Sequence, residues 1–178
     1  MSATGEPRRE PAPPSLERYL NELLSGGQLT IAAAESCSGG GVARRITAVA
    51  GSSAYFLGSI VAYANDAKRT LLGVSSDILE TRGAVSPDAA VAMAEGARRV
   101  FGADLAVSTT GIAGPGGATE RKPVGLVYLG VAGAGQTRSE EHRFSGDRAT
   151  IVAAATEAAL RLLVAAVEAE LPRRSPAG

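Results

Sequence analysis

The chain has 178 residues, of which 45% are hydrophobic and 20% are charged, and this suits a single globular domain with a sizeable core. Eighteen acidic residues balance eighteen basic ones, so no net charge draws the protein onto nucleic acid or a membrane surface. The sequence indicates neither a secretory signal nor a long apolar run, and we expect a cytoplasmic protein. One cysteine and one histidine exclude an internal disulfide and a zinc-type cluster, so we expect neither metal nor cofactor.

Both ends of the chain predict disorder. Residues 1–14 are rich in proline and charge, and residues 172–178 are similar, so neither stretch can bury enough apolar surface to fold by itself. Between them, residues 15–171 are predicted to form one domain without internal repeats. Ser15 can cap its first helix, over residues 16–24, and the glycines that follow can end it.

Apolar runs bounded by turn residues predict the next elements. Ser86-Pro87 is a cap followed by a proline at the first helical position, which indicates a helix start. In chain order we predict a strand over 29–34, a helix over 42–49, a strand over 59–64, a short helix capped by Asn65, a helix to Phe101 and a strand over 105–110.

A hairpin and a long helix are predicted after a glycine-rich loop. VGLVYLGVA and QTRSEEHRF are separated by Gly133-Ala134-Gly135, and Ser145 can cap a helix over 147–171. Strands that alternate with helices form parallel sheets, to which the hairpin adds an antiparallel pair. The sequence therefore predicts a three-layer α/β/α domain on a mixed sheet of about five strands.

Only two of the eighteen basic residues are lysines, Lys68 and Lys122, and both lie in distinctive segments. An ammonium group can lose its proton near neutral pH whereas a guanidinium cannot, and a helix start would lower the pKa of Lys68. Ser53 and Tyr63 precede Lys68 around the second strand, and the three could act as nucleophile, relay and base without histidine. Taken singly, each has a structural alternative: a turn cap, a packed strand end or a solvated lysine.

Two glycine-rich turns follow predicted strands, where α/β folds gather binding residues. The first, Glu35-Ser36-Cys37-Ser38-Gly39-Gly40-Gly41, could hold a phosphate at a helix start or could be a tight turn capped by Ser38. The second, Gly111-Ile112-Ala113-Gly114-Pro115-Gly116-Gly117, resembles a P-loop without its Lys-Ser/Thr, which excludes an ATPase. Its length and glycine content favour contact with a substrate over a flexible crossing loop.

Other catalytic signatures are incomplete. A Ser-His-Asp triad would need His142, which lies in an alternating, strand-like segment. Gly51-Ser52-Ser53 lacks the second glycine of a nucleophile elbow. Tyr63 and Lys68 are one residue too far apart for a short-chain dehydrogenase, and no G-x-G-x-x-G follows the first strand, so a nicotinamide-dependent oxidoreductase is disfavoured.

Five motifs are the most specific feature of the chain: AAAESCSGGGVARRIT, AGSSAYFLGSIVAYANDAKRTLLGV, RGAVSPDAAVAMAEGA, STTGIAGPGGATERKPVG and FSGDR. In order and spacing they resemble the C-terminal domain of the CinA family, named for competence/damage-inducible protein A, from about Leu16 to Leu171. That family includes nicotinamide-nucleotide amidohydrolases, which convert nicotinamide mononucleotide to nicotinate mononucleotide and ammonia. The resemblance implies an α/β/α fold, Ser53 as the nucleophile, and Tyr63 and Lys68 as its catalytic partners.

The substrate implied by the resemblance is nicotinamide mononucleotide. Its phosphate would lie at the first glycine turn, helped by Lys122 or Arg148, although Lys122 could only solvate its loop and Arg148 could pair with an acid. The expected substrate-binding residues are Glu35, Ser36, Ser38, Gly39, Gly40, Gly111, Ala113, Gly114, Gly116, Gly117, Lys122 and Arg148.

An alternative function is a catalytically silent nucleotide-binding or scaffold module linked to DNA uptake or repair. The presence of Ser53, Tyr63 and Lys68 favours the enzyme, and the balanced charge disfavours direct binding of nucleic acid. Helices rich in alanine and valine favour a homo-oligomer, and we expect no membrane partner.

Overall fold

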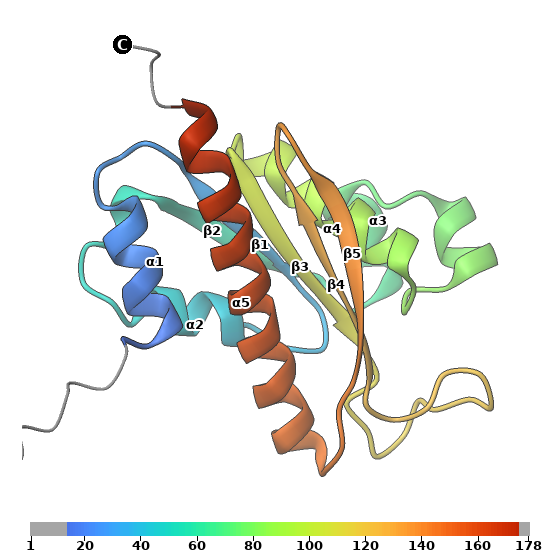
Figure 1. The fold of residues 1–178 in the computed structure, drawn as a ribbon. Coiled ribbons are helices and arrows are strands. Elements are labelled where there is room, and N and C mark those ends of the chain that lie inside the picture. The colour runs from blue at the N-terminus through green and yellow to red at the C-terminus, as the bar shows by residue number, and fades with distance from the viewer. Residues whose placement is uncertain (1–13, 175–178) are drawn as a thin grey trace, which may run out of the picture.

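The computed structural model describes residues 14–174, so most of the residues predicted to be disordered lie outside the described range. These residues form one five-stranded sheet with the strand order β2-β1-β3-β4-β5 (Figure 1). Neighbouring strands among β2, β1 and β3 are parallel, whereas β4 is antiparallel to β3 and β5 is antiparallel to β4. The predicted mixed sheet is therefore confirmed. The strands are β1 (Ile31–Glu35), β2 (Phe56–Val61), β3 (Leu105–Gly111), β4 (Leu126–Ala132) and β5 (Thr137–Arg143).

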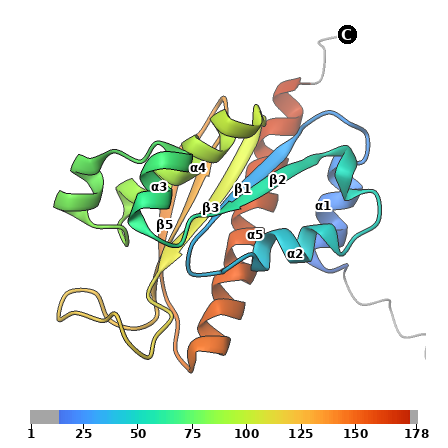
Figure 2. The same cartoon turned by 180° about the vertical axis from the view of Figure 1, so that it is seen from behind.

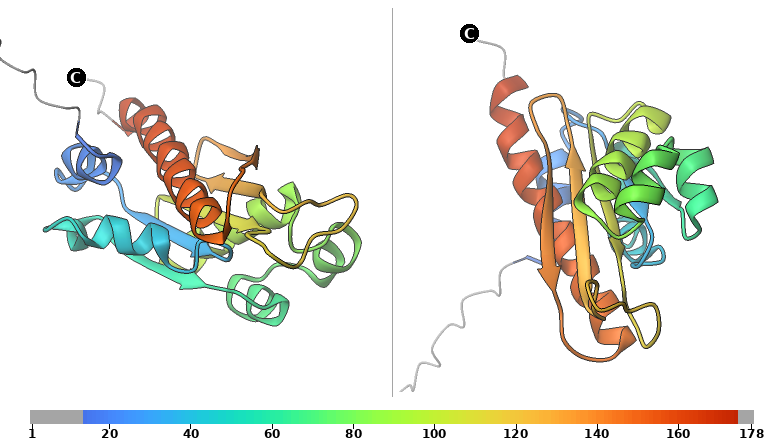
Figure 3. Two further views of the ribbon diagram at one scale, coloured as in Figure 1. Left: turned by 90° about the horizontal axis from the view of Figure 1, so that it is seen from below. Right: turned by 90° about the vertical axis from the view of Figure 1, so that its right-hand side faces the viewer.

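Helices cover both faces of the sheet (Figures 2 and 3). Successive side chains of a strand point to opposite faces, so Ile31 and Ala33 of β1 join one core cluster and Ala32 and Ala34 join the other. The predicted three-layer α/β/α architecture is confirmed. On the first face lie α1 (Leu16–Leu24), α2 (Gly41–Thr47) and α5 (Arg148–Arg174), and on the second lie α3 (Asn65–Leu72) and α4 (Pro87–Phe101).

The long helix α5 supplies much of the first core. Residues 148–171 are long and apolar enough to cross a membrane by length and composition alone, so the expectation that the chain lacks such a run is wrong. In the fold, however, 56% of the most apolar stretch is buried. Its residues pack against α1, α2 and the sheet, and this burial accounts for their apolar character.

Two glycines allow α4 to approach its neighbours closely. A Cβ atom at Gly96 would lie 2.1 Å from the carbonyl oxygen of Leu72, at the end of α3. A Cβ atom at Gly130 of β4 would lie 2.3 Å from the carbonyl oxygen of Ala90 in α4. Any side chain at either position would push α4 away. The close packing holds α3, which carries Lys68, against the rest of the domain.

Strand β2 starts and ends three residues before the predicted strand. The chain opposite Ile31 and Ala32 contains one extra residue, Leu57, so the strand continues upstream through an irregularity next to Gly58. The glycine made this part of the sequence resemble a turn, which is why the start was misplaced. Ala64, not Asn65, precedes α3, and no side chain caps that helix.

Other helix boundaries differ in detail. Ser86 caps α4 as predicted, since its Oγ accepts a hydrogen bond from the Ala89 N–H at 3.1 Å. At the start of α5 the cap is Asp147 and not Ser145, because Asp147 Oδ1 accepts from the Thr150 N–H at 2.8 Å. A short π-helical segment, η2 (Ile78–Arg82), was not predicted.

Candidate active site

A pocket lies at the carboxyl ends of β1 and β3, beside the first turns of α3 and α5. Its volume is about 240 Å³. Open α/β sheets bind ligands at this edge, because the loops that leave parallel strands converge there. The predicted site residues that line the pocket are Ser36, Tyr63, Lys68, Gly111, Ala113, Gly114, Gly116, Gly117 and Arg148.

The side chain of Lys68 reaches from α3 to the turn that follows β1. It is 1% exposed, and its Nζ donates hydrogen bonds to Ser36 Oγ at 3.0 Å and to the carbonyl oxygens of Ala62 at 2.8 Å and Tyr63 at 3.1 Å. Within residues 14–174, no carboxylate forms an ion pair with it. A buried ammonium without a counter-ion is unfavourable, and groups of this kind concentrate at functional sites.

The surroundings of Lys68 prepare it to act as a base. Burial lowers the pKa of its amino group and outweighs the opposite influence of the neighbouring Cys37. A neutral amine has two N–H donors, and the two backbone carbonyls accept both of them. The nitrogen lone pair is then left for the third partner, the hydroxyl of Ser36. The deprotonated lysine is thus oriented to take the proton of Ser36.

Ser53 does not belong to this pocket. It is an exposed residue of the short helix η1 (Ser52–Ala54), directly before β2, whereas Tyr63 and Lys68 follow that strand. A strand rises about 3.3 Å per residue, so β2 separates the two sites by roughly 20 Å. The predicted grouping of Ser53, Tyr63 and Lys68 around one strand end is therefore wrong. The hydroxyl that contacts Lys68 is that of Ser36.

Tyr63 lines the pocket without touching the Lys68 amine through its phenol. The Tyr63 hydroxyl accepts a hydrogen bond from Arg148 Nη2 at 2.7 Å, and Lys68 contacts the backbone carbonyl of Tyr63 instead. Arg148, the first residue of α5, also donates through Nη1 to the Gly114 carbonyl at 2.8 Å. The predicted relay through the tyrosine hydroxyl is absent from this arrangement. Arg148 and Tyr63 instead join the glycine-rich loop to the segment before α3.

The start of α2 is already occupied by a carboxylate of the chain. Glu35 is fully buried, and it accepts hydrogen bonds from the N–H groups of Gly40 at 3.0 Å, Val42 at 3.0 Å and Ala43 at 2.9 Å. These are the donors that a bound phosphate would need. The predicted phosphate site there is therefore wrong. The segment is a tight turn, but Gly40 and not Ser38 precedes α2, and the Ser38 hydroxyl donates to Glu35 instead. Glu35, Ser38, Gly39 and Gly40 do not line the pocket.

Lys122 is also engaged outside the pocket. Its Nζ donates to the carbonyl oxygen of Arg82, at the end of η2, at 2.7 Å. This contact ties the long loop between β3 and β4 to the segment before α4. Lys122 therefore lies outside the pocket, where it neither makes the predicted substrate contact nor merely solvates its loop.

The contact between Ser36 and Lys68 was not predicted from the sequence, where Ser36 was expected only to contact substrate. One signal could have found it: Ser36 directly follows a parallel strand, whereas Ser53 precedes one, and sites form after such strands. In the part of the chain that the structure describes, no three His, Cys, Asp or Glu side chains are placed to hold a metal ion. Further pocket residues that the sequence did not single out are Cys37, Asn65, Ala84, Val85, Thr110 and Ile112.

Comparison with known proteins places the chain in a family. Two solved structures share the fold over most of the chain: a competence/damage inducible protein from Agrobacterium tumefaciens, with 42% identity and a TM-score of 0.82, and a competence-damaged protein (CinA) superfamily protein from Escherichia coli, with 34% identity and a TM-score of 0.80. The first match covers 84% of this chain and 92% of the other, and the second covers 84% and 88%.

Curated relatives give the same result. A CinA-like protein from Geobacter sulfurreducens is 53% identical over 137 residues, which are 77% of this chain and 33% of that protein. A CinA-like protein from Thermosynechococcus vestitus is 56% identical over 135 residues, 75% of this chain and 32% of that protein. The chain thus spans about a third of the length of these relatives. Residues 14–167 match the family model of the CinA C-terminal domain, and the chain belongs to that family.

Proposed function

We propose that the protein is an amidohydrolase that deamidates nicotinamide mononucleotide, with Ser36 as its nucleophile and Lys68 as its base. The 3.0 Å contact between Lys68 Nζ and Ser36 Oγ carries the proposal. Serine–lysine pairs are a known variant of the serine hydrolase site, and they need no histidine. The resemblance to nicotinamide-nucleotide amidohydrolases supplies the substrate class, whereas the names of the relatives state no reaction. We place the activity in the cytoplasm.

In the first half of the reaction, neutral Lys68 takes the proton of the Ser36 hydroxyl. The alkoxide attacks the carboxamide carbon, and the resulting tetrahedral intermediate carries a negative charge on oxygen. Lys68, now an ammonium, gives its proton to the departing amine, which leaves as ammonia. The nicotinoyl group remains as an ester on Ser36.

The second half of the reaction repeats the chemistry with water. Lys68, neutral again, takes a proton from a water molecule, whose oxygen attacks the ester carbon. The proton returns to Ser36 Oγ as the nicotinate product leaves. Burial of Lys68 supports both halves, because a lowered pKa increases the fraction of neutral amine at the start of each half.

Arg148 is the candidate for the substrate phosphate. It is an exposed residue that lines the pocket, and its hydrogen bonds to Gly114 and Tyr63 use only two of the five guanidinium donors. The other predicted phosphate contacts are engaged elsewhere, since Glu35 occupies the start of α2 and Lys122 binds the Arg82 carbonyl. A guanidinium held by two hydrogen bonds is oriented for a phosphate before it binds.

The test is ammonia release from nicotinamide mononucleotide by the purified protein and by two matched variants. Ser36→Ala should abolish turnover, whereas Ser53→Ala should retain nearly wild-type rates because Ser53 lies at the other end of β2. The opposite pattern would return the nucleophile to Ser53. A folded wild-type protein that releases no ammonia from the nucleotide would contradict the proposal and favour a catalytically silent nucleotide-binding module.

A further inference from the structure

A chain of buried hydrogen bonds connects the backbone of Ser36 to Glu35. The Ser36 N–H donates to the carbonyl oxygen of Thr109 at 3.0 Å and to Thr109 Oγ1 at 3.3 Å. Thr109 Oγ1 lies 2.6 Å from Ser38 Oγ, and Ser38 Oγ donates to Glu35 Oε2 at 2.7 Å. Glu35 and Thr109 are fully buried, and Ser38 is 4% exposed.

The Glu35 carboxylate determines which atom donates in every hydrogen bond of this series. An ionised carboxylate can only accept, so the single proton of Ser38 points to Glu35. The hydrogen bond between the two hydroxyls must then be donated by Thr109, and Thr109 Oγ1 accepts from Ser36. Donors that point one way along such a chain polarise one another and strengthen each bond.

The same carboxylate anchors the helix that follows Ser36. Its two oxygens accept the N–H groups of Gly40, Val42 and Ala43, and the positive end of α2 stabilises the negative charge. Ser36 therefore lies between a strand whose last residue is Glu35 and a helix that the Glu35 side chain holds. The turn cannot shift without breaking bonds at a buried charge, which is unfavourable.

We propose that Glu35, acting through Ser38 and Thr109, is a positioning residue that holds Ser36 against Lys68. The inference rests on the proposed role of Ser36 as the nucleophile. Glu35 touches neither the pocket nor the reacting atoms, and its effect is to hold the Ser36 turn in the one arrangement that places Oγ within hydrogen-bond distance of Nζ. A displacement of about 1 Å at a reacting group can slow a reaction by roughly a hundredfold.

Thr109→Val is the most direct test, because it removes one hydroxyl while keeping the shape of the side chain. The Ser36 N–H keeps the Thr109 carbonyl, and Ser38 keeps Glu35, so only the Cys37 thiol, a weak donor that also contacts the Thr109 side chain, loses a partner. Thr109→Ser restores the hydroxyl. Ser59→Ala is the matched control. Ser59 Oγ donates to the Glu35 carboxylate at 3.0 Å, but it is not part of the series of hydrogen bonds that leads to Ser36.

Two readouts are needed. The first is the rate at which phenylmethylsulfonyl fluoride modifies Ser36, a step in which Oγ displaces fluoride from sulfur and Lys68 takes the proton. The second is the split between kcat and KM for nicotinamide mononucleotide. We expect Thr109→Val to lower the modification rate and kcat by about tenfold or more, with KM changed by less than about twofold, because geometry and not binding is lost.

Thr109→Ser and Ser59→Ala should both remain near the wild-type rates. Glu35→Gln should match or exceed the defect of Thr109→Val if it folds. Wild-type modification of Ser36 in Thr109→Val, or an equal loss in Ser59→Ala, would overturn the positioning role. Modification of Ser36 in a wild-type protein that releases no ammonia would contradict the proposed function alone, since the sulfonyl fluoride reports on Ser36 without the nucleotide.

Discussion

Lys68 Nζ lies 3.0 Å from Ser36 Oγ although the two residues are 32 positions apart in the chain. Ser36 directly follows β1, and Lys68 lies in the first turn of α3, the helix that follows β2. These strands are parallel neighbours, with Glu35 opposite Val61, so both segments leave the sheet at the same edge. The register of one strand pair therefore creates the contact on which the proposed chemistry depends.

The first prediction concerns the base. Lys68→Arg keeps the charge but cannot provide a neutral amine, so turnover should fall by about a hundredfold or more. In the wild type, kcat should rise with pH through an apparent pKa below that of an ordinary lysine, because burial lowers the pKa of Lys68. Steady-state rates between neutral and alkaline pH measure both effects. An active Lys68→Arg enzyme with an unchanged pH profile would remove Lys68 from the base role.

The second prediction concerns stability at the same residue. Because the pKa of Lys68 is lowered on folding, the unfolded chain holds this proton more tightly than the folded chain. Stability contributed by this group must then rise as pH increases from the folded pKa toward about 10.4, the unfolded value. The wild type should gain stability relative to Lys68→Met over that window, in urea denaturation at matched pH values. A constant difference between the two proteins would contradict a lowered pKa.

The third prediction separates the two basic residues of the predicted phosphate site. Arg148→Ala should raise KM for nicotinamide mononucleotide by about tenfold or more and leave the slow reaction of free nicotinamide unchanged, since only the nucleotide carries the phosphate. Lys122→Ala is the control, because Lys122 binds the Arg82 carbonyl outside the pocket. Kinetics with both substrates test this assignment. Equal increases in KM for the two variants would count against it.

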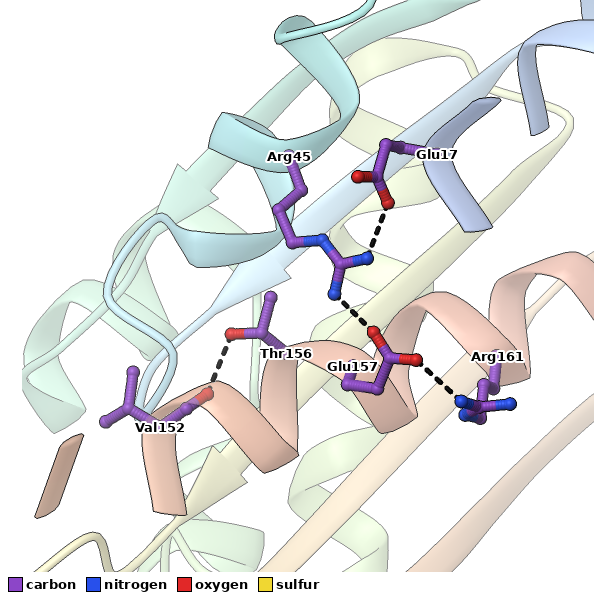
Figure 4. A network of polar contacts seen from close by, with 6 residues as sticks. All are labelled: Glu17, Arg45, Val152, Thr156, Glu157 and Arg161. Atoms are coloured by element: carbon purple, nitrogen blue, oxygen red, sulfur yellow. Dashed lines mark hydrogen bonds and ion pairs between the residues drawn. The ribbon is translucent and has the colours of Figure 1, made fainter. Parts of the chain in front are cut away.

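The fourth prediction concerns the ion pairs that join three helices of the first face (Figure 4). Arg45 of α2 bridges Glu17 of α1 and Glu157 of α5, and Glu157 also pairs with Arg161. Because these side chains are partly exposed, Arg45→Met should lower the free energy of unfolding by only about 1 kcal/mol at pH 7. Thermal or urea denaturation of the two proteins measures the difference.

Acid should diminish the effect of Arg45→Met. Burial raises the pKa of Glu17, but its own backbone N–H and Arg45 outweigh burial and hold the pKa below its ordinary value. A carboxyl with a lowered pKa stabilises the fold above its unfolded pKa, and this contribution disappears as pH falls through the folded value. The gap between wild type and Arg45→Met should therefore narrow in acid. A gap that widens would show that the pair does not stabilise the fold through charge.

The fifth prediction concerns a buried hydroxyl. Tyr55 is fully buried in the first core, and its hydroxyl has no hydrogen-bond partner among the described residues. Burying an unpaired hydroxyl is unfavourable by about 1 to 3 kcal/mol, so Tyr55→Phe should be neutral or stabilising. Thermal denaturation of the wild type and Tyr55→Phe measures whether the substitution raises or lowers stability. A clear loss of stability would indicate a partner for the hydroxyl that the structure does not contain.

The order and type of most elements follow from the amino-acid sequence, because their signals lie in neighbouring residues. Apolar runs identified β1 and β3, and the Ser86-Pro87 pair identified the start of α4. The alternation of strands and helices, followed by a hairpin, was sufficient for the mixed sheet and its three layers. One exception is β2, where the extra residue Leu57 beside Gly58 displaced the predicted strand.

The side chains that meet at the site are brought together by the folded chain. Ser36 and Ser53 both flank strands in the sequence, but β2 carries Ser53 away from Lys68 while the register of β1 against β2 brings Ser36 to it. Likewise, the glycine turn after β1 has the composition of a phosphate site, yet Glu35 folds back onto its N–H groups. Contacts of this kind depend on strand register and on which polar groups are buried together, and these are properties of the folded chain and not of adjacent residues.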